Sequence, residues 1–287
     1  MSAPIERIVD AHVHLWDPAR ADWYPYLVGR RDVGLGDVSG MSRRFDQPTY
    51  FSESANWNVV KFVHVAAATA PYSGDETREL EEMSGATGHP DAIIGGIVPS
   101  DPISDTERLL DDQMRSSRFR GIRPMGGGTG VPSADVLRAL DERDLVFELM
   151  AHTDELEASA AALERWSDLT IVVEHAGWPQ SDTAEEFALW QRGISTLAAM
   201  GDNVHCKLSG LAMPLHSMDA HVLGPWIEHC IDSFGVDRCM FASNFPVDAM
   251  HGTFDQLYSA FDAVTADLDA DARAKLFAAN AERLYRC

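Results

Sequence analysis

Two histidines, separated by one residue, stand at the end of the first apolar segment of the chain, residues 8–14. This segment is typical of a β-strand, and because side chains alternate across a strand we expect Asp10, His12 and His14 on one face and the apolar residues between them on the other. Neutral imidazole is the commonest metal ligand in proteins. The pair therefore predicts a site that binds one metal ion at the end of this strand.

Seven further strand-like segments follow, separated by amphipathic helical segments. We expect the eight strands at 8–14, 59–65, 92–98, 119–123, 145–150, 169–175, 203–208 and 238–243. Eight strands alternating with helices favour a closed barrel of parallel strands over an open sheet. The sequence therefore predicts one α/β domain over residues 1–287, a (β/α)8 TIM barrel with an irregular inserted segment at 15–58 and a last helix at 271–284.

Polar side chains gather at the carboxyl ends of these strands, where barrels of this kind bind their substrates. They are His12, His14, His64, Arg123, Glu148, His152, His175, Lys207, Asn244 and Asp248. A single buried histidine is often only a hydrogen-bonded part of a core. A barrel interior has no structural need for so many ionisable groups, however, since burying them unpaired is unfavourable. Their convergence predicts an active site.

The composition limits the partners of the chain. It carries 23 basic and 45 acidic residues, a net charge of −22, which argues against nucleic acid and anionic membranes as partners. No apolar run precedes the first expected strand in this sequence, and no apolar run in it approaches the length that spans a membrane. Its four cysteines form no Cys-X-X-Cys pair, which fits a reducing compartment. We expect a cytoplasmic protein with a small-molecule substrate, and a homodimer as the default for a barrel enzyme.

Four motifs carry a family resemblance over essentially the whole chain. They are Val-Asp-Ala-His-Val-His-Leu-Trp-Asp-Pro at 9–18, Glu-His-Ala-Gly-Trp-Pro at 174–179, Lys-Leu-Ser-Gly-Leu at 207–211 and Phe-Ala-Ser-Asn-Phe-Pro-Val-Asp at 241–248. With them the chain resembles the amidohydrolase superfamily (amidohydrolase-2 type), and within it the branch of sugar-acid lactonases and pyrone-dicarboxylate lactonase. The resemblance implies a (β/α)8 barrel that hydrolyses a cyclic ester or a related acyl bond.

The resemblance also implies a metal site. His12 and His14 match the first-strand pair of the family, and His175 matches its sixth-strand histidine. With an oxygen of Asn244 these residues would hold one divalent ion, Zn²⁺ or Mn²⁺, and leave a position open for water. The branch includes metal-free lactonases, in which the same histidines would hydrogen-bond the substrate carbonyl and stabilise its oxyanion. Both alternatives stay open.

Asn244 departs from the family pattern, which usually has an aspartate there as general base. An amide cannot take a proton from water at neutral pH, so the proton acceptor is expected to be Asp248, His175 or Glu148. Asn244 would then orient the attacking water. The candidate catalytic residues are His175, Asn244 and Asp248.

The remaining strand-end residues are candidates for substrate binding. Arg123 either binds a carboxylate group of the substrate through two hydrogen bonds or stabilises the glycine-rich loop that follows it. Lys207 pairs with Glu148 across the barrel or acts as an electrophile, and Trp178 forms a pocket wall or part of the core. The candidate substrate-binding residues are Arg123, Glu148, His152, Lys207, Trp178 and His64.

Three functional hypotheses follow. The leading one is a hydrolase that opens a small lactone, carboxylated or sugar-acid-like, with an activated water. The second is a metal-dependent decarboxylase of an aromatic or unsaturated acid. The third is a catalytically impaired barrel that only binds a ligand, which rests on Asn244 alone. The substrate depends on the loops at 15–58, 124–132 and 244–253, whose conformations the sequence does not define.

Overall fold

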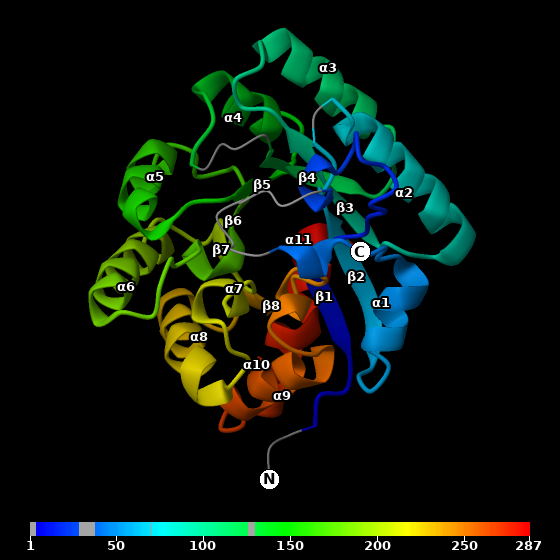
Figure 1. Ribbon diagram of the computed structural model, residues 1–287. Helices are drawn as coiled ribbons and strands as arrows, with labels where there is room; N and C mark the ends of the chain where they lie inside the picture. The colour runs from blue at the N-terminus through cyan, green and yellow to red at the C-terminus, as the bar shows by residue number, and fades with distance from the viewer. Residues whose placement is uncertain (1–3, 29–37, 70, 126–129) are drawn as a thin grey trace.

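A computed structural model describes residues 4–28, 38–69, 71–125 and 130–287 (Figure 1). The segments 29–37 and 126–129 lie outside the described residues, so two of the loops expected to shape the pocket, 15–58 and 124–132, are described only in part. Within the described part of the chain, no helix combines the length and the apolar character that crossing a membrane requires.

Eight parallel strands form a single sheet in the order β1 to β8. Their bounds are Ile8–Val13, Val59–Val65, Ala92–Ile97, Phe119–Pro124, Val146–Leu149, Ile171–Val173, Val204–Leu208 and Cys239–Phe241. The end of β8 returns to β1, where Asn244 N donates to His12 O at 2.9 Å and His14 N donates to Phe245 O at 2.8 Å. The sheet is thus a nearly closed barrel, and the predicted (β/α)8 fold is confirmed.

Helices connect the strands and surround the barrel (Figure 1). The bounds of α1 to α6 are Gln47–Glu53, Ser73–Thr87, Ile103–Gln113, Ala134–Asp141, Leu156–Leu163 and Ala184–Ala198. Those of α7 to α11 are Ala212–Leu215, Ala220–Phe234, Phe254–Val264, Ala270–Ala274 and Asn280–Tyr285. Side-chain caps begin several of them; in α9, for example, Thr253 accepts from Gln256 N.

Two predicted stretches differ from the structure. The segment 15–58, expected to be irregular, contains helix α1, whose start is capped by Asp46 accepting from Thr49 N at 3.1 Å. Pro48 lies in its first turn, where proline is tolerated but reads in the sequence as a turn signal. The helix expected at 271–284 is divided into α10, a π-helical turn at Lys275–Ala279 and α11, because periodicity alone does not reveal a single wider turn.

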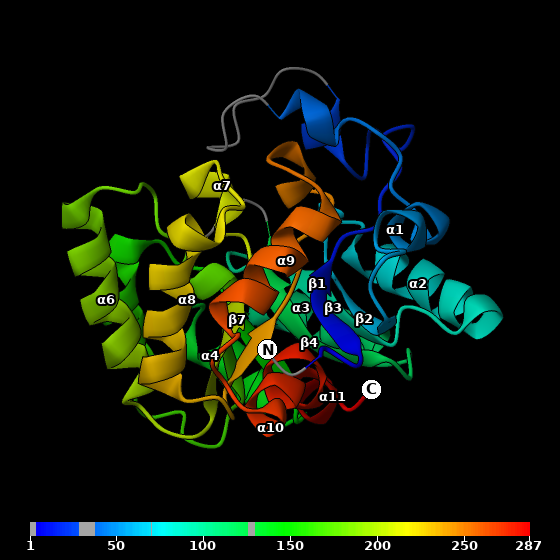
Figure 2. The same ribbon diagram turned by 90° about the horizontal axis from the view of Figure 1, so that it is seen from below.

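The barrel interior is filled by small and β-branched side chains of the strands, such as Val9, Ala11 and Val63. Ala281 and Tyr285 of α11 pack into the same cluster. Figure 2 shows α10 and α11 at the end of the barrel opposite the segment that follows β1. The C-terminal helix therefore closes the amino-terminal end of the barrel.

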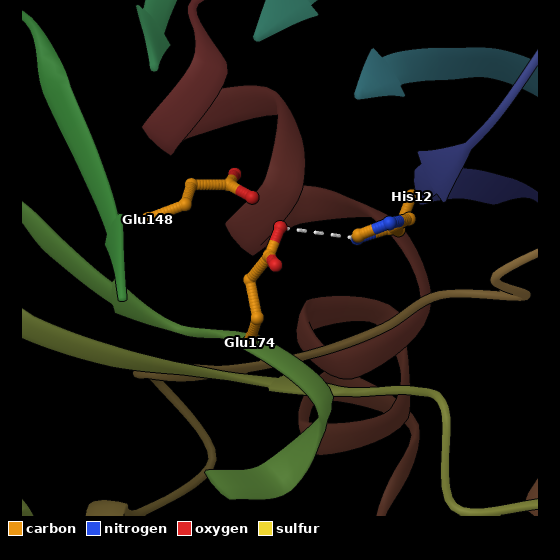
Figure 3. A group of neighbouring side chains, drawn as sticks. All are labelled: His12, Glu148 and Glu174. Carbon is orange, nitrogen blue, oxygen red and sulfur yellow. Dashed lines mark ion pairs between the residues drawn. The ribbon is translucent and has the colours of Figure 1, made fainter. Parts of the chain in front are cut away.

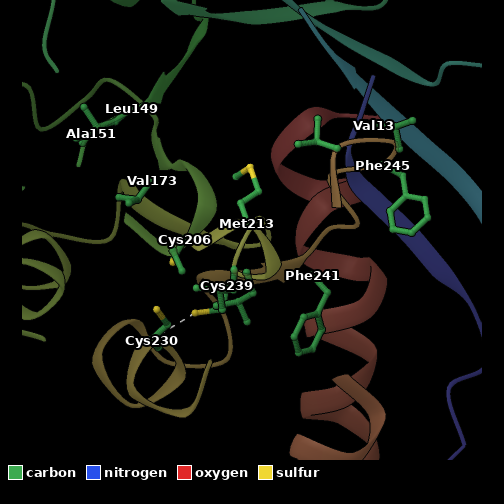
Figure 4. Close-up of a cluster of buried hydrophobic side chains, with 14 of the residues drawn as sticks. Val13, Leu149, Ala151, Val173, Cys206, Met213, Cys230, Cys239, Phe241 and Phe245 are labelled. Atoms are coloured by element: carbon green, nitrogen blue, oxygen red, sulfur yellow. Dashed lines mark hydrogen bonds between the residues drawn. The ribbon is translucent and has the colours of Figure 1, made fainter. Parts of the chain in front are cut away.

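A second cluster fills the layer between the barrel and its outer helices. Figure 4 shows part of it, in which Cys206 of β7 and Cys239 of β8 face Cys230 of α8. Cys239 Sγ donates to Cys230 O at 3.6 Å, and these three cysteines are buried and not disulfide-bonded. The side chains that face outward from the strands thus pack against the surrounding helices and hold them to the barrel.

Strand β1 does not keep the strict alternation expected from the sequence. Its pairing with β2 shifts register between Asp10 and Val13, as at a β-bulge. Val9 and Ala11 point into the barrel, whereas Asp10 accepts a hydrogen bond from Tyr50 of α1 at 2.8 Å, outside it. The prediction that Asp10 shares a face with the two histidines is therefore wrong.

Candidate active site

Three imidazoles meet at the carboxyl end of the barrel. His12 and His14 approach each other with their Nε2 atoms 3.1 Å apart, and the ring centroids of His12 and His175 are 4.7 Å apart. His14 Nδ1 donates to Val65 O at 2.7 Å, and His175 Nδ1 bonds Ser209 Oγ at 3.0 Å. The structure thus brings together the three histidines named from the sequence and orients two of them through Nδ1.

Burial keeps these imidazoles neutral. Together with the positive charges of Arg123 and Lys207, it lowers the pKa of His175 to about 3. Burial, with Lys207 next, also lowers the pKa of His12 well below its usual value, and burial together with Arg123 does the same for His14. A neutral imidazole has a free lone pair, which is what a metal ion or a substrate hydroxyl group requires.

The backbone at the end of β6 is unusual. His175 and Ala176 have φ values of 53° and 52°, in the left-handed region. This turn allows two consecutive side chains, Glu174 and His175, to face the site. Gly210 lies against the imidazole, and a Cβ at this position would come within 2.5 Å of His175 Nδ1, so the turn requires glycine here.

Glu174 is a site residue that the sequence analysis did not name. Its Oε1 is 3.6 Å from His12 Nδ1, and its Oε2 is 3.5 Å from Arg123 Nη1 and 4.0 Å from His175 Nε2. Neither oxygen makes a direct hydrogen bond to the described residues. Burial alone would raise the pKa of Glu174, but Arg123, Glu148 and Lys207 favour the ionised form, and the pKa is lowered overall. Its position directly before His175 at a strand end was the signal that could have identified it.

A second carboxylate lies deeper in the barrel. Glu148 accepts from Lys207 Nζ at 2.7 and 2.8 Å and from Tyr285 OH at 2.5 Å, and the three side chains are fully buried. The predicted pairing of Lys207 with Glu148 across the barrel is confirmed. Burial raises the pKa of Glu148 above its ordinary value, and the neighbouring Glu174 adds to this shift, whereas the Lys207 ammonium group opposes it and favours the ionised form.

Two sets of side chains in the site are candidates to hold a divalent ion, and of these only the deeper set has all its ligand atoms within 4.8 Å of one another. In the deeper arrangement, ligand atoms of His12, Glu148 and Glu174 lie within 4.8 Å of one another (Figure 3). Both oxygens of Glu148 already bind Lys207, however, so an ion there would compete with an ammonium group. The arrangement expected from the sequence uses His12, His14 and His175. Metal-bound histidines usually have a hydrogen-bond partner at the ring nitrogen that does not bind the ion. The three histidines fit this pattern, because each Nδ1 lies near a carboxylate, carbonyl or hydroxyl group.

Asn244 and Asp248 form a hydrogen-bonded pair in the segment after β8, which lies next to β1. Asn244 Nδ2 donates to Asp248 Oδ1 at 2.8 Å, which leaves the amide oxygen as the Asn244 atom suited to orient a water molecule. Burial raises the pKa of Asp248 to about 8. At neutral pH Asp248 is therefore mostly protonated and acts first as the partner that fixes the Asn244 amide.

The raised pKa of Asp248 predicts how the stability of the folded protein depends on pH. Because the folded state keeps the Asp248 proton up to about pH 8 and the unfolded state releases it near 3.8, stability should fall as pH rises between these values. An Asp248→Asn variant has the same shape but never ionises. The Tm of the wild type should therefore fall relative to that of the variant as pH rises from 5 to 9, measured by thermal unfolding. Tm values that run in parallel over this range would show that burial does not control Asp248.

The other predicted substrate contacts lie around the imidazoles. Arg123 Nη2 donates to Ala66 O at 2.6 Å, so this guanidinium is partly committed to the backbone. The Trp178 ring is 5.9 Å from His175 and 4.8 Å from His152, measured between centroids, and both Trp178 and His152 are half-buried. They form one wall at the mouth of the site.

His64 lies farther from the other imidazoles. It is buried, its Nδ1 accepts from Leu15 N at 3.3 Å, and its Nε2 is 3.7 Å from Glu76 Oε1. Its ring centroid is 6.5 Å from that of His14. These contacts connect β2 to α2 and to the segment after β1, and they place His64 beside the site.

Comparisons with known proteins identify relatives that match nearly the full length of this chain. An uncharacterized protein of Sinorhizobium fredii is 32% identical over 97% of this chain and 98% of its own length. An L-fucono-1,5-lactonase of Burkholderia ambifaria is 30% identical over 97% of this chain and 95% of its own length. Both relatives match almost the whole chain.

A solved structure shares the fold. An amidohydrolase from Burkholderia multivorans, crystallised with bound zinc, superposes with a TM-score of 0.81 over 97% of this chain and 99% of its own, at 23% identity. The family model described as Amidohydrolase matches residues 9–287. The chain thus belongs to the amidohydrolase family, as the four sequence motifs predict.

Proposed function

We propose that this amidohydrolase opens the ring of a small sugar-acid-like lactone with an activated water molecule. The observation that carries the proposal is the group of three neutral imidazoles beside an ionised, buried carboxylate, Glu174, at the carboxyl end of the barrel. The relative named L-fucono-1,5-lactonase supports the substrate class. A lactone carbonyl develops negative charge when water attacks it, and an imidazole N–H that faces the site, such as that of His175, can stabilise that charge, whereas the proton of His14 is on Nδ1 and donates to Val65 O.

The residues divide the chemistry among them. His12, His14 and His175 would orient the lactone carbonyl, and the side-chain oxygen of Asn244, fixed by Asp248, would orient the water. Glu174 would accept the water's proton, since it is the ionised carboxylate whose oxygens are not committed to direct hydrogen bonds with the described residues. The carboxyl group of Asp248, protonated at neutral pH, would be available to donate to the leaving alkoxide.

We also propose that His12, His14 and His175 would hold one divalent cation, Zn²⁺ or Mn²⁺. When bound, such an ion would act as a Lewis acid on the lactone carbonyl. The zinc in the related Burkholderia multivorans amidohydrolase supports this choice. With the ion bound, the Nδ1 atoms of the three histidines would face Glu174, Val65 and Ser209.

The function is tested by following proton release from L-fucono-1,5-lactone, with and without a chelator, on protein of known metal content. Hydrolysis that chelation abolishes and zinc restores would support the metal-assisted reaction, and hydrolysis that survives chelation would support the metal-free one. Product analysis separates the alternatives: carbon dioxide release from an aromatic or unsaturated acid would indicate the decarboxylase. Ligand binding without turnover of either class would indicate the binding barrel.

The Asn244→Asp variant separates an enzyme from a barrel that only binds. We expect it to hydrolyse the lactone about 10-fold more slowly or worse, because a carboxylate at 244 would replace the amide donor to Asp248 and place two buried acids 2.8 Å apart. Steady-state kinetics and Tm measure both effects. An inactive wild type with an active Asn244→Asp variant would contradict the proposal and favour the impaired barrel.

We also propose that residues 1–287 act as one domain in the cytoplasm and as a homodimer. The four free cysteines support a reducing compartment. Light scattering on the purified protein would measure its oligomeric state.

A further inference from the structure

His12 Nδ1 lies between a hydrogen-bond donor and a hydrogen-bond acceptor. Lys207 Nζ, which can only donate a hydrogen bond, is 3.5 Å away, and Glu174 Oε1, which accepts one when ionised, is 3.6 Å away. A neutral imidazole carries its proton on one nitrogen only, so Nδ1 can satisfy one of these neighbours but not both. The two distances are nearly equal. The tautomer of His12 therefore depends on whether Nδ1 accepts a hydrogen bond from Lys207 or donates one to Glu174.

The two tautomers differ in what they leave for a metal ion. When Nδ1 accepts from Lys207, the proton is on Nε2 and points to His14 Nε2 at 3.1 Å. His14 can accept it, because its own proton is on Nδ1 and donates to Val65 O at 2.7 Å. This arrangement is a continuous chain of hydrogen bonds from Lys207 to the backbone, and it occupies both Nε2 atoms.

When Nδ1 instead donates to Glu174, the lone pair of His12 Nε2 is free. It then faces the lone pair of His14 Nε2 across 3.1 Å. Two nitrogen ligands of a tetrahedral zinc ion, each about 2.05 Å from it, are about 3.3 Å apart. In this tautomer the two Nε2 lone pairs have nearly the spacing that binding to one shared metal ion requires. Glu174 accepts the hydrogen bond from His12 Nδ1.

Lys207 is held firmly in its position. Both oxygens of Glu148 bind its ammonium group, Tyr285 OH donates to the same carboxylate, and the Tyr285 ring lies 5.3 Å from Nζ. All of these side chains are fully buried. The ammonium group cannot turn toward solvent, and the C-terminal helix α11 contributes through Tyr285 to keeping it beside His12.

We propose that Lys207 sets the tautomer of His12 and thereby limits the affinity of the site for a divalent cation, while Glu174 acts in the opposite direction. Lys207 is thus a positioning residue that acts through His12. The inference rests on the metal-assisted form of the proposed function. It also gives a role to the buried lysine–glutamate pair below the histidines, since buried ion pairs can often be replaced by hydrophobic residues without loss of stability.

The test is a measurement of Zn²⁺ affinity by competition with a chromophoric chelator. In a Glu148→Gln, Lys207→Met double variant both charges are removed together, so that no unpaired charge stays buried. We expect it to bind Zn²⁺ about 10-fold or more tightly than the wild type, and Glu174→Gln to bind it about 10- to 100-fold more weakly. The matched control is Asp271→Asn, Lys275→Met, a double variant of a pair in which exposed Asp271 of α10 lies 2.9 Å from half-buried Lys275 of the π-helical turn; it should not change the affinity.

Imidazole ¹⁵N spectra of the metal-free proteins provide a second, independent measurement. His12 should carry its proton on Nε2 in the wild type and on Nδ1 in the Glu148→Gln, Lys207→Met variant. The inference is wrong if that variant binds Zn²⁺ no more tightly than the wild type, if neither binds it, or if the tautomer does not change. Neither measurement uses a lactone, so shifted affinities without hydrolysis would reject only the proposed function, and hydrolysis with unshifted affinities would reject only this inference.

Discussion

A His12→Ala, His175→Ala double variant should lose at least about 10³-fold in kcat/KM for lactone hydrolysis, because removing a single group that stabilises a developing oxyanion already costs about 10²- to 10³-fold. The two rings lie 4.7 Å apart, so the variant removes adjacent parts of one site. The loss should appear with and without added Zn²⁺. Steady-state kinetics on the folded variant, verified by circular dichroism, would measure it.

The matched control is His221→Ala, which removes an exposed imidazole on α8. It should leave kcat/KM within about twofold of the wild-type value, since surface substitutions away from special features have small effects. If the double variant kept wild-type rates, the three imidazoles would not be the reacting centre, and the proposed function would be wrong.

Glu174→Gln should lower kcat by about 10²- to 10⁴-fold, the range that positioned proton transfer typically contributes. The change keeps the shape of the side chain and removes its charge and its ability to accept a proton. KM should change little, because the proposed role lies in the proton transfer and not in substrate binding. Kinetics at saturating Zn²⁺ would separate this effect from weaker metal binding.

Glu185→Gln is the matched control for this variant, because Glu185 is an exposed glutamate in the first turn of α6. Its kcat should equal that of the wild type. An unchanged kcat in Glu174→Gln would show that another group accepts the proton.

The sequence alone predicted the barrel, because alternation between strand and helix periods is a local property of the chain. All eight strands occur within a few residues of the expected positions. Placement at strand ends also predicted that His12, His14 and His175 would meet, since parallel strands of a barrel bring their carboxyl ends to one rim. The Glu148–Lys207 pair followed from the same reasoning.

The tertiary structure decided the features that depend on broken alternation or on distant parts of the chain. The register shift in β1 places Asp10 outside the barrel, and the left-handed backbone at His175 brings Glu174 into the site. Tyr285 reaches Glu148 from 137 residues away. Neither local periodicity nor residue type encodes these contacts, because they arise only when separate segments pack together. The charge states of the site follow from the same packing, since burial and neighbouring charges set the pKa of each group.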